Sequence, residues 1–524
     1  MPTNCVYDRM RFFRQTLLLL LLTGAAAVGH CAESSDPLLD LFVQKGMLTQ
    51  EEVNRVRAEA EAKRTNAATM PDMGSKWKIS NAIKSVELFG DIRLRYEQRQ
   101  ANTPDDSRLE LDRARAALRV GLRGEAFDGF YYGLRLDTSS NPRSPWVTLG
   151  SSTPSPFGKS AFGINVGQVY LGWRPADWVD LTIGKMPNPL YTTPMVWDPD
   201  LNPEGAAERF KYTVGSADFF ANFGQFLYQD NSPSYISGSL LLPVVPSGIR
   251  QQTSTDNTFM LAWQAGVNYH FNQEVSAKVA PAIYQYVGLE PTTSLSVGVS
   301  PNGIGDTFIG EGSYGGPSSP TPINGLTAQN GVLYNQVGVN NLLVLAIPFE
   351  VNFKIKQLNA RVFGDYAYNF QGSERATAAV NALAATVANT GGNPPLLQYG
   401  PQTKDVHAYQ AGVALGNKDS LGLVYGTTSR KHAWEVRSYW QHVEQYALDP
   451  NLLDSDFFEG RANLEGVYVA VAYGFTENVV GTFRYGYAWR IHDKLGTGGS
   501  NLDIPQINPI DHYNLLQVDL TLRF

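Results

Sequence analysis

The chain of 524 residues has only two cysteines, Cys5 and Cys31, and both stand near its N-terminus. The remainder therefore cannot form a disulfide scaffold or a cysteine-based metal site. The absence of bridges is compatible with a protein that crosses an oxidising compartment without needing them. Beyond the N-terminal region, no segment has the roughly 18 apolar residues of a membrane-spanning helix. This argues against an inner-membrane protein.

Catalytic motifs are also missing. The sequence contains no Gly-x-Ser-x-Gly, no His-Glu-x-x-His and no phosphate-binding loop. Its seven histidines show no metal-ligand spacing. We therefore predict that the protein is not an enzyme and that it uses neither a cofactor nor a metal.

The N-terminus has the pattern of a secretory signal peptide. Three arginines within residues 9–14 precede an apolar core over residues 17–28, and cleavage is expected near Ala27 or Ala32. We assign residues 1–32 to this signal. The mature chain is then exported without a helical anchor.

Residues 33–64 show a helical rather than a strand pattern. Asp36 followed by Pro37 is a helix-start signal, and Thr49 with Glu52 makes a capping box. We predict a small periplasmic helical hairpin here. The alternative is a coiled coil that helps the protein to trimerise or contacts the cell wall.

The periodicity changes to two in residues 86–524, after a polar linker over residues 65–85. At its start, apolar Leu88, Ile92 and Leu94 alternate with charged residues. Such segments run for roughly 10 to 15 residues, which suits a tilted membrane strand better than a soluble sheet. Alternating apolar and polar faces also account for a mean hydropathy of only −0.22. We predict an all-β fold, a transmembrane antiparallel barrel.

Short and long connections alternate along this region. Seven short turns fall near residues 128, 176, 215, 272, 356, 429 and 476. Eight long loops fall near residues 101–108, 140–164, 187–205, 230–256, 289–341, 372–405, 447–460 and 492–511. These connections predict sixteen strands. With an even number of strands, the first strand begins and the last strand ends on the side of the short turns, which is the periplasmic side.

The last strand carries the most specific pattern. Five apolar residues occupy alternate positions up to the final residue: Leu516, Val518, Leu520, Leu522 and Phe524. An amphipathic terminal strand that ends in an aromatic residue resembles the signal read by the outer-membrane barrel-assembly machinery. We assign this signal to Leu520, Leu522 and Phe524.

Three segments resemble the bacterial outer-membrane Putative porin family. They are Phe-Gly-Asp-Ile-Arg-Leu-Arg-Tyr at 89–96, Gly-Lys-Met-Pro-Asn-Pro at 184–189 and Val-Trp-Asp-Pro-Asp-Leu-Asn-Pro-Glu-Gly at 196–205. The resemblance extends over nearly the whole mature chain. It implies a 16-stranded barrel like that of general porins, usually a homotrimer, with the third loop folded inward as a constriction.

Basic residues gather on the polar faces of neighbouring strands. Since an arginine in the lipid core costs about 2–4 kcal/mol, the polar face must be the lumen. We predict a pore-lining basic wall made of Arg93, Arg95, Arg113, Arg115, Arg119, Arg123, Arg135, Arg209 and Lys211. The alternative is that each arginine only braces the wall by pairing with a nearby acid: Glu87, Asp91, Glu97 or Asp137.

The third loop would face this wall with a set of constriction residues: Trp197, Asp198, Asp200 and Glu204. Bases and acids opposed across a narrow pore create a transverse field that sets ion selectivity. Inward bases outnumber inward acids, so we predict a weak anion preference. The net charge of −7 is compatible with it, because the acids concentrate in the loops and the N-terminal segment.

The leading functional hypothesis is a water-filled outer-membrane channel for passive diffusion of small hydrophilic solutes or ions. One alternative is a substrate-specific channel for phosphate-like anions. Another is a structural barrel that tethers the envelope through residues 33–64. The expected partners are outer-membrane lipid, the barrel-assembly machinery, the solutes and two further copies in a homotrimer, and no nucleic acid.

Overall fold

The computed structural model describes residues 82–102, 106, 108–139, 144–150, 163–229, 257–287, 342–377, 380–381, 400–417, 420–493, 495–497 and 510–524. All of them belong to one compact unit, Ser80–Phe524. The predicted signal peptide, the helical segment and the linker up to residue 81 lie outside the described residues. Within the described part, no helix has the length and apolar character needed to cross a membrane.

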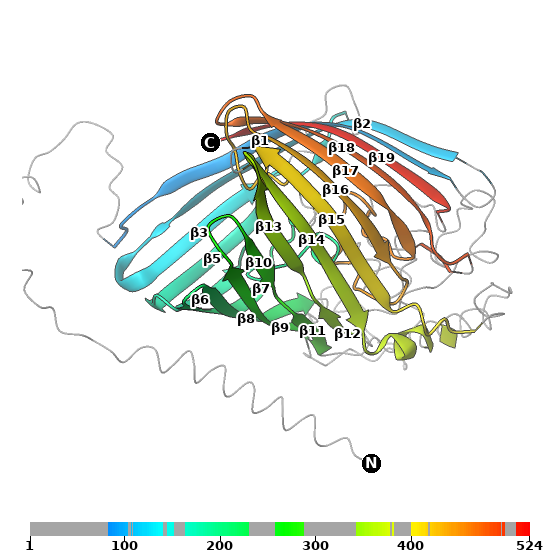
Figure 1. Ribbon diagram of the computed structural model, residues 1–524, viewed down its shortest axis with the longest axis horizontal. Helices are drawn as coiled ribbons and strands as arrows, with labels where there is room; N and C mark the ends of the chain where they lie inside the picture. The colour runs from blue at the N-terminus through cyan, green and yellow to red at the C-terminus, as the bar shows by residue number, and fades with distance from the viewer. Residues whose placement is uncertain are drawn as a thin grey trace, which may run out of the picture. The chain divides into compact units, whose positions relative to one another are not determined.

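The described unit is one antiparallel sheet that closes on itself (Figure 1). Its strands are β1 (Glu87–Asn102), β2 (Arg108–Glu125), β3 (Phe130–Asp137), β4 (Val147–Thr148), β5 (Asn165–Ala176), β6 (Val179–Lys185), β7 (Glu204–Val214), β8 (Ala217–Gln229), β9 (Thr258–His270), β10 (Ser276–Val279), β11 (Ala282–Val287), β12 (Leu343–Ala346), β13 (Phe349–Ile355), β14 (Leu358–Asn369), β15 (His407–Asn417), β16 (Trp434–Val443), β17 (Leu464–Gly474), β18 (Val479–Arg490) and β19 (His512–Arg523). The first strand pairs with β2 on one side and with β19 on the other. This closing pair makes the sheet a barrel.

The nineteen strands fill sixteen positions around the barrel, because three positions hold two short strands each. Both β3 and β4 pair with β2, both β10 and β11 pair with β9, and both β12 and β13 pair with β14. Pro281 separates β10 from β11, and Pro348 separates β12 from β13. Proline interrupts a ladder because it has no N–H to donate. The sixteen strands predicted from the sequence are confirmed.

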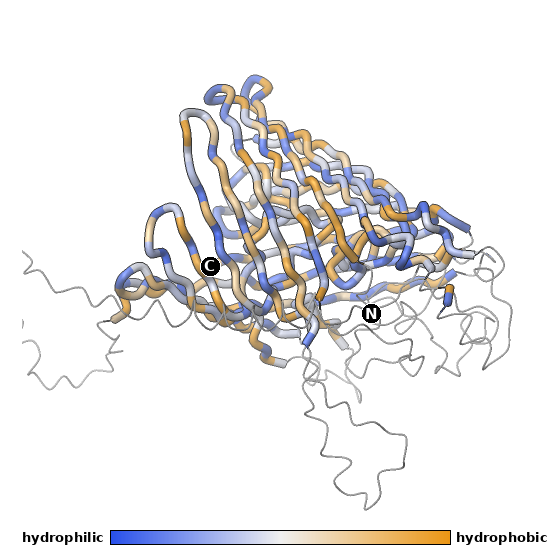
Figure 2. The backbone as a smooth tube through the Cα atoms, turned by 90° about the horizontal axis from the view of Figure 1, so that it is seen from below, coloured by the Kyte–Doolittle hydropathy of each residue, from blue (hydrophilic) through white to orange (hydrophobic). Residues whose placement is uncertain are grey.

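The two faces of the strands differ as the period of two predicts. On β1, Leu88 is 59% exposed and Leu94 51% exposed, whereas Arg95 is 5% exposed and Glu97 is fully buried. Figure 2 shows hydrophobic and hydrophilic residues alternating along the strands. The outward face is therefore an apolar surface suited to lipid, and the polar face lines the lumen.

The shortest turns lie at one end of the barrel, which we call the short-turn end. Residues 177–178 and 215–216 are two-residue turns between neighbouring strands. Gly215 has a φ of +58°, a conformation that glycine adopts without steric cost. The start of β1 and the end of β19 lie at this same end, as an even number of strands requires.

One connection at the short-turn end is longer than predicted. The chain between β15 and β16 runs through residues 418–433, where the sequence suggested a tight turn near residue 429. Its described part folds into the lumen, since the N–H groups of Gly422 and Val424 both donate to the Glu435 carboxylate at 2.9 Å. Periodicity misses such a segment because a side chain of the next strand holds it.

Candidate functional site

The connection between β6 and β7, residues 186–203, lies inside the barrel, and we call it loop 3. Gln264 on β9 holds it as a neighbouring strand would. The Gln264 amide oxygen accepts from the Tyr191 N–H at 2.8 Å, and the amide nitrogen donates to the Tyr191 carbonyl at 2.7 Å. The Thr193 hydroxyl donates to Asp365 on β14 at 2.6 Å. Loop 3 is thus bound to lumen-facing side chains of separate strands.

A second inward segment meets loop 3, and we call it loop 7: residues 444–463, between β16 and β17. The N–H of Asp198 donates to the Leu452 carbonyl at 2.6 Å, and the N–H of Asp454 donates to the Pro194 carbonyl at 3.1 Å. The Asp198 carboxylate accepts from the N–H of Ser455 at 2.9 Å. These bonds join the two loops directly.

The contact between the two loops is rich in carboxyl groups. Burial raises the pKa of Asp198 well above its ordinary value, and the carboxylates of Asp454 and Asp200 raise it further. Burial raises the pKa of Asp454 to about 7, and Asp456 adds to that shift. Burial acts in the same direction on Asp456, but nearby guanidinium groups, Arg95 first among them, hold its pKa well below the usual range. The contact therefore favours neutral carboxyls beside a charged one.

The seven predicted wall arginines on β1 to β3 all have carboxylate partners. The pairs, at 2.5 to 3.9 Å, are Arg93–Asp91, Arg95–Asp519, Arg113–Glu97, Arg115–Glu97, Arg119–Asp91, Arg123–Glu87 and Arg135–Asp137. We call these residues the braced wall. All four acids that the sequence offered as bracing partners take part in it.

Glu97 is the centre of the braced wall. Its buried carboxylate lies 2.9 Å from Arg99, 2.5 Å from Arg113 and 3.7 Å from Arg95. Arg99 also pairs with Glu459 of loop 7 at 2.6 Å. Arg99 was not among the predicted wall residues, although it lies on the same face of β1 as Arg95. Glu459 was not predicted either, because loop residues show no alternation of apolar and polar residues.

Three of the four predicted constriction residues lie in loop 3. Trp197 is 3% exposed and Asp198 is 2% exposed, so both are covered by neighbouring protein groups. The Asp200 carboxylate lies nearer the wall and accepts from Arg119 Nη1 at 3.0 Å. Asp198 therefore contacts loop 7 rather than open lumen, and Asp200 is the acid that faces the predicted basic wall.

The fourth predicted constriction residue, Glu204, lies elsewhere. It is the first residue of β7, and its carboxylate accepts from Lys185 Nζ at 2.6 Å. Arg209 lines a lumen cavity, so even-numbered residues of β7 face outward. The prediction that Glu204 belongs to the loop was wrong, because β7 begins at residue 204, two residues earlier than the predicted loop over residues 187–205 implies.

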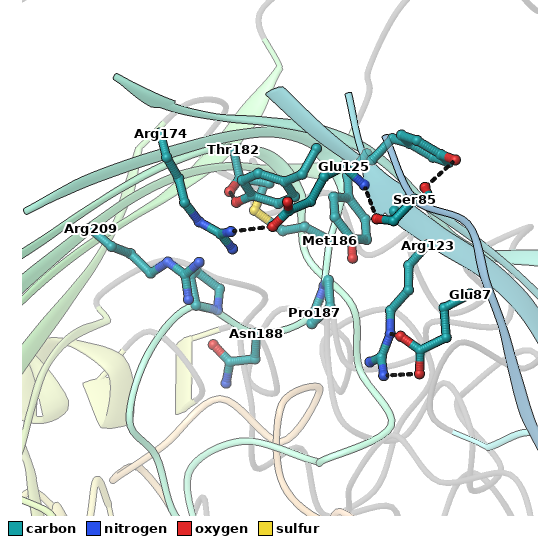
Figure 3. A pocket seen from close by; sticks show the side chains of 15 residues that line it. Ser85, Glu87, Arg123, Glu125, Arg174, Thr182, Met186, Pro187, Asn188 and Arg209 are labelled. Atoms are coloured by element: carbon teal, nitrogen blue, oxygen red, sulfur yellow. Dashed lines mark hydrogen bonds and ion pairs between the residues drawn. The ribbon is translucent and has the colours of Figure 1, made fainter. Parts of the chain in front are cut away.

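Two adjoining cavities lie between loop 3 and the short-turn end, with volumes of about 410 and 700 Å³. We call them together the vestibule. Arg174, Asn188, Pro189 and Arg209 line both cavities. In Figure 3 the guanidinium ends of Arg174 and Arg209 lie next to each other, close to Asn188 of loop 3.

The vestibule holds the remaining predicted bases, Arg209 and Lys211. Arg174 and Lys278 lie beside them, and nothing in the sequence indicated Lys278. Lys278 was missed because its strand, β10, has only four residues and shows no clear alternation. Within the described ranges, no group of three or more His, Cys, Asp or Glu residues is arranged to hold a metal ion.

Strands that alternate lipid-facing and lumen-facing side chains around a closed ring are the architecture of a bacterial outer-membrane channel. The model of the Putative porin family matches residues 95–307 and 321–524. The chain belongs to this family, whose members are outer-membrane channels and not enzymes.

Three solved structures are similar to the chain at low sequence identity. The anion-selective porin from Comamonas acidovorans is 8% identical with a TM-score of 0.40, covering 84% of this chain and 99% of that one. The high-pH structure of Pseudomonas putida OprB is 10% identical with a TM-score of 0.42, covering 84% and 94%. The outer-membrane channel DcaP of Acinetobacter baumannii is 11% identical with a TM-score of 0.38, covering 85% and 99%. No curated protein matches the chain.

Proposed function

We propose that the channel passes small hydrophilic solutes or ions by passive diffusion, with loop 3 as its constriction and a weak preference for anions. The position of loop 3 carries this proposal. Its backbone at Tyr191 is bonded to the lumen-facing Gln264, at the level of the strands rather than beyond their ends. A segment held there narrows the path through the lumen, and the side chains around such a narrowing decide which ions pass.

The charges of the vestibule support the anion preference. Its larger cavity is lined by four bases and two acids: Arg174, Arg209, Lys211, Lys278, Asp177 and Asp180. A cleft with charge of one sign and walls of low dielectric constant concentrates ions of the opposite sign. The braced wall adds less to this field, because each of its arginines lies against a carboxylate.

The surroundings of the barrel follow from its outward face. Leu520, Leu522 and Phe524 are 40 to 47% exposed on that face, where the assembly machinery could read them before the barrel enters lipid. We also propose the homotrimer that is usual in the resembling family. The envelope-tether alternative depends on residues 33–64, which lie outside the described residues, and no described contact favours it.

Conductance across a planar bilayer under a potassium chloride gradient tests the proposal. We expect discrete conductance steps and a reversal potential whose sign indicates chloride preference. A folded barrel without conductance would contradict the channel. Conductance with cation preference would support the channel function and contradict the proposed anion preference.

A further inference from the structure

Two arginines of the vestibule converge on one carboxylate. Oδ2 of Asp180 accepts from Arg209 Nη2 at 2.6 Å and from Arg174 Nε at 3.2 Å. The Tyr131 hydroxyl donates to the other oxygen of Asp180, and its ring lies 4.2 Å from the Arg174 guanidinium carbon. Asp180 and Tyr131 therefore fix the direction of both guanidinium groups.

Asp180 alone cannot accept from all the N–H groups of two guanidinium groups. Arg174 is 49% exposed and Arg209 is 41% exposed, so both also face the open cavity. Glu125 forms a second ion pair with Arg174, but at 3.8 Å it is too far to accept a hydrogen bond from that guanidinium. The N–H groups that Asp180 does not use can bind a second oxyanion, because a guanidinium fork matches the two oxygens of a carboxylate.

Two lysines extend this positive surface without acid partners. Among the described residues, neither Lys211 nor Lys278 forms an ion pair, although both line the same cavity. Glu350 lies opposite Lys278 in the strand register and attracts it electrostatically, but its carboxylate forms an ion pair with Arg361, at 3.4 Å, and not with Lys278. The larger cavity of the vestibule therefore carries four bases against two acids, Asp177 and Asp180, on its lining.

Apolar surface lies beside these charges. Lys278 Nζ is 3.5 Å from the ring centroid of Tyr191 and 5.2 Å from that of Phe220. Pro189 and Leu190 of loop 3 complete this side of the cavity. Inorganic anions need only the charged groups, whereas an anion with an apolar body can also cover the rings and the loop.

We propose that the vestibule is a binding site for small organic carboxylates that carry an aromatic or similarly apolar body. The carboxylate binds the Arg174 and Arg209 guanidinium groups, and the apolar body lies against Tyr191, Phe220 and loop 3. The site rests on the proposed channel function, to which it adds a substrate class. It places the preferred solute on the short-turn side of loop 3.

Calorimetric titration of the detergent-solubilised full-length protein with benzoate tests the site independently of conduction. We expect saturable binding that weakens by about tenfold to a hundredfold in Arg209→Gln, since hydrogen bonds to charged groups contribute about 1.5–3 kcal/mol. Lys278→Gln should also weaken it. Arg135→Gln is the matched control: it removes the same group from the lumen away from the vestibule, and the affinity should stay unchanged.

Three results would overturn the site: no saturable benzoate binding, equal affinity in wild type and Arg209→Gln, or inorganic phosphate binding at least as tightly as benzoate. Conductance measured on the same preparations separates this inference from the proposed function. If the protein conducts ions but does not bind benzoate, the proposed binding site is refuted and the channel function is not. Benzoate binding that fails in Arg209→Gln supports the site even in a protein that does not conduct.

Discussion

The buried arginines under loop 7 and the arginines of the vestibule both face the lumen, yet their environments are opposite. Arg95 and Arg99 side chains are 3% and 0% exposed, and each lies against two or more carboxylates. Arg174 and Arg209 are 49% and 41% exposed and share Asp180, and only Arg174 has a second carboxylate, Glu125 at 3.8 Å. The difference comes from loop 7, which covers one side of the lumen with acids. Parity tells which way an arginine points, but the facing loop decides what it does.

The free-energy cost of burying a charge explains why the two groups of arginines differ in their partners. A charge removed from water needs a partner, and breaking a buried pair costs far more than breaking an exposed one. Arginines under loop 7 must therefore be neutralised, whereas those in the vestibule stay hydrated and available. The comparison predicts that equal substitutions have unequal effects in the two regions.

The largest effect is expected for Glu97→Gln in the braced wall. This change leaves several buried guanidinium groups without their shared carboxylate and should lower the free energy of unfolding by about 3–5 kcal/mol. Denaturant unfolding, followed by the electrophoretic mobility of the folded barrel, measures it. Glu87→Gln, which breaks the exposed pair with Arg123, is the control and should change stability little. Similar losses in the two variants would erase the distinction between buried and exposed pairs.

A smaller effect is expected where loop 3 separates the two regions. Gln264→Leu removes both hydrogen bonds to Tyr191, and the loop attachment should weaken by about 1–3 kcal/mol. Single-channel recordings should then show larger open-state current fluctuations. Gln410→Leu alters a lumen-facing glutamine that bonds to Gln441 and should leave the fluctuations unchanged. If the current fluctuations of Gln264→Leu equal those of wild type, other contacts are sufficient to hold loop 3.

The contact between loops 3 and 7 should depend on pH. A carboxyl whose pKa is raised on folding holds its proton more tightly in the folded state. The stability from Asp454 is therefore complete below its unfolded pKa of about 4 and is lost as the pH rises through about 7. The thermal unfolding midpoint of wild type should fall across this window. Asp454→Asn, neutral throughout, should reduce the slope, and an unchanged slope would place the titration elsewhere.

The smallest effect concerns selectivity. Lys211→Gln removes a vestibule charge that has no described ion-pair partner, so the reversal potential should shift modestly toward cations. The comparison variant combines Arg135→Gln with Asp137→Asn, which removes a braced pair and keeps the net charge. It should not shift the potential. Equal shifts in both variants would show that the two walls act on ions alike.

The sequence was sufficient for everything that depends on local periodicity. The sixteen strands follow from the alternation of short and long connections, and the outward apolar face and the lumen-facing arginines follow from alternation along each strand. Contacts over long separations could not be predicted, such as the bond between Asp198 and Ser455, 257 positions apart. Glu204 failed for a simpler reason, since the predicted loop ended at residue 205 whereas β7 already begins at Glu204. The sequence therefore indicated which arginines face the lumen but not which loop residues lie against them.

The pairing of β1 with β19 also has a consequence in time. Arg95 and Asp519 are 424 positions apart, whereas most other neighbouring strands are joined by the chain itself. At the end of this seam, Gly90 and Phe524 exchange backbone hydrogen bonds of 2.9 and 3.1 Å. Contacts between residues so far apart in the sequence form slowly, because the chain loses conformational entropy before the contacts compensate for that loss. We therefore expect the seam to form last and to set the rate at which the ring becomes complete.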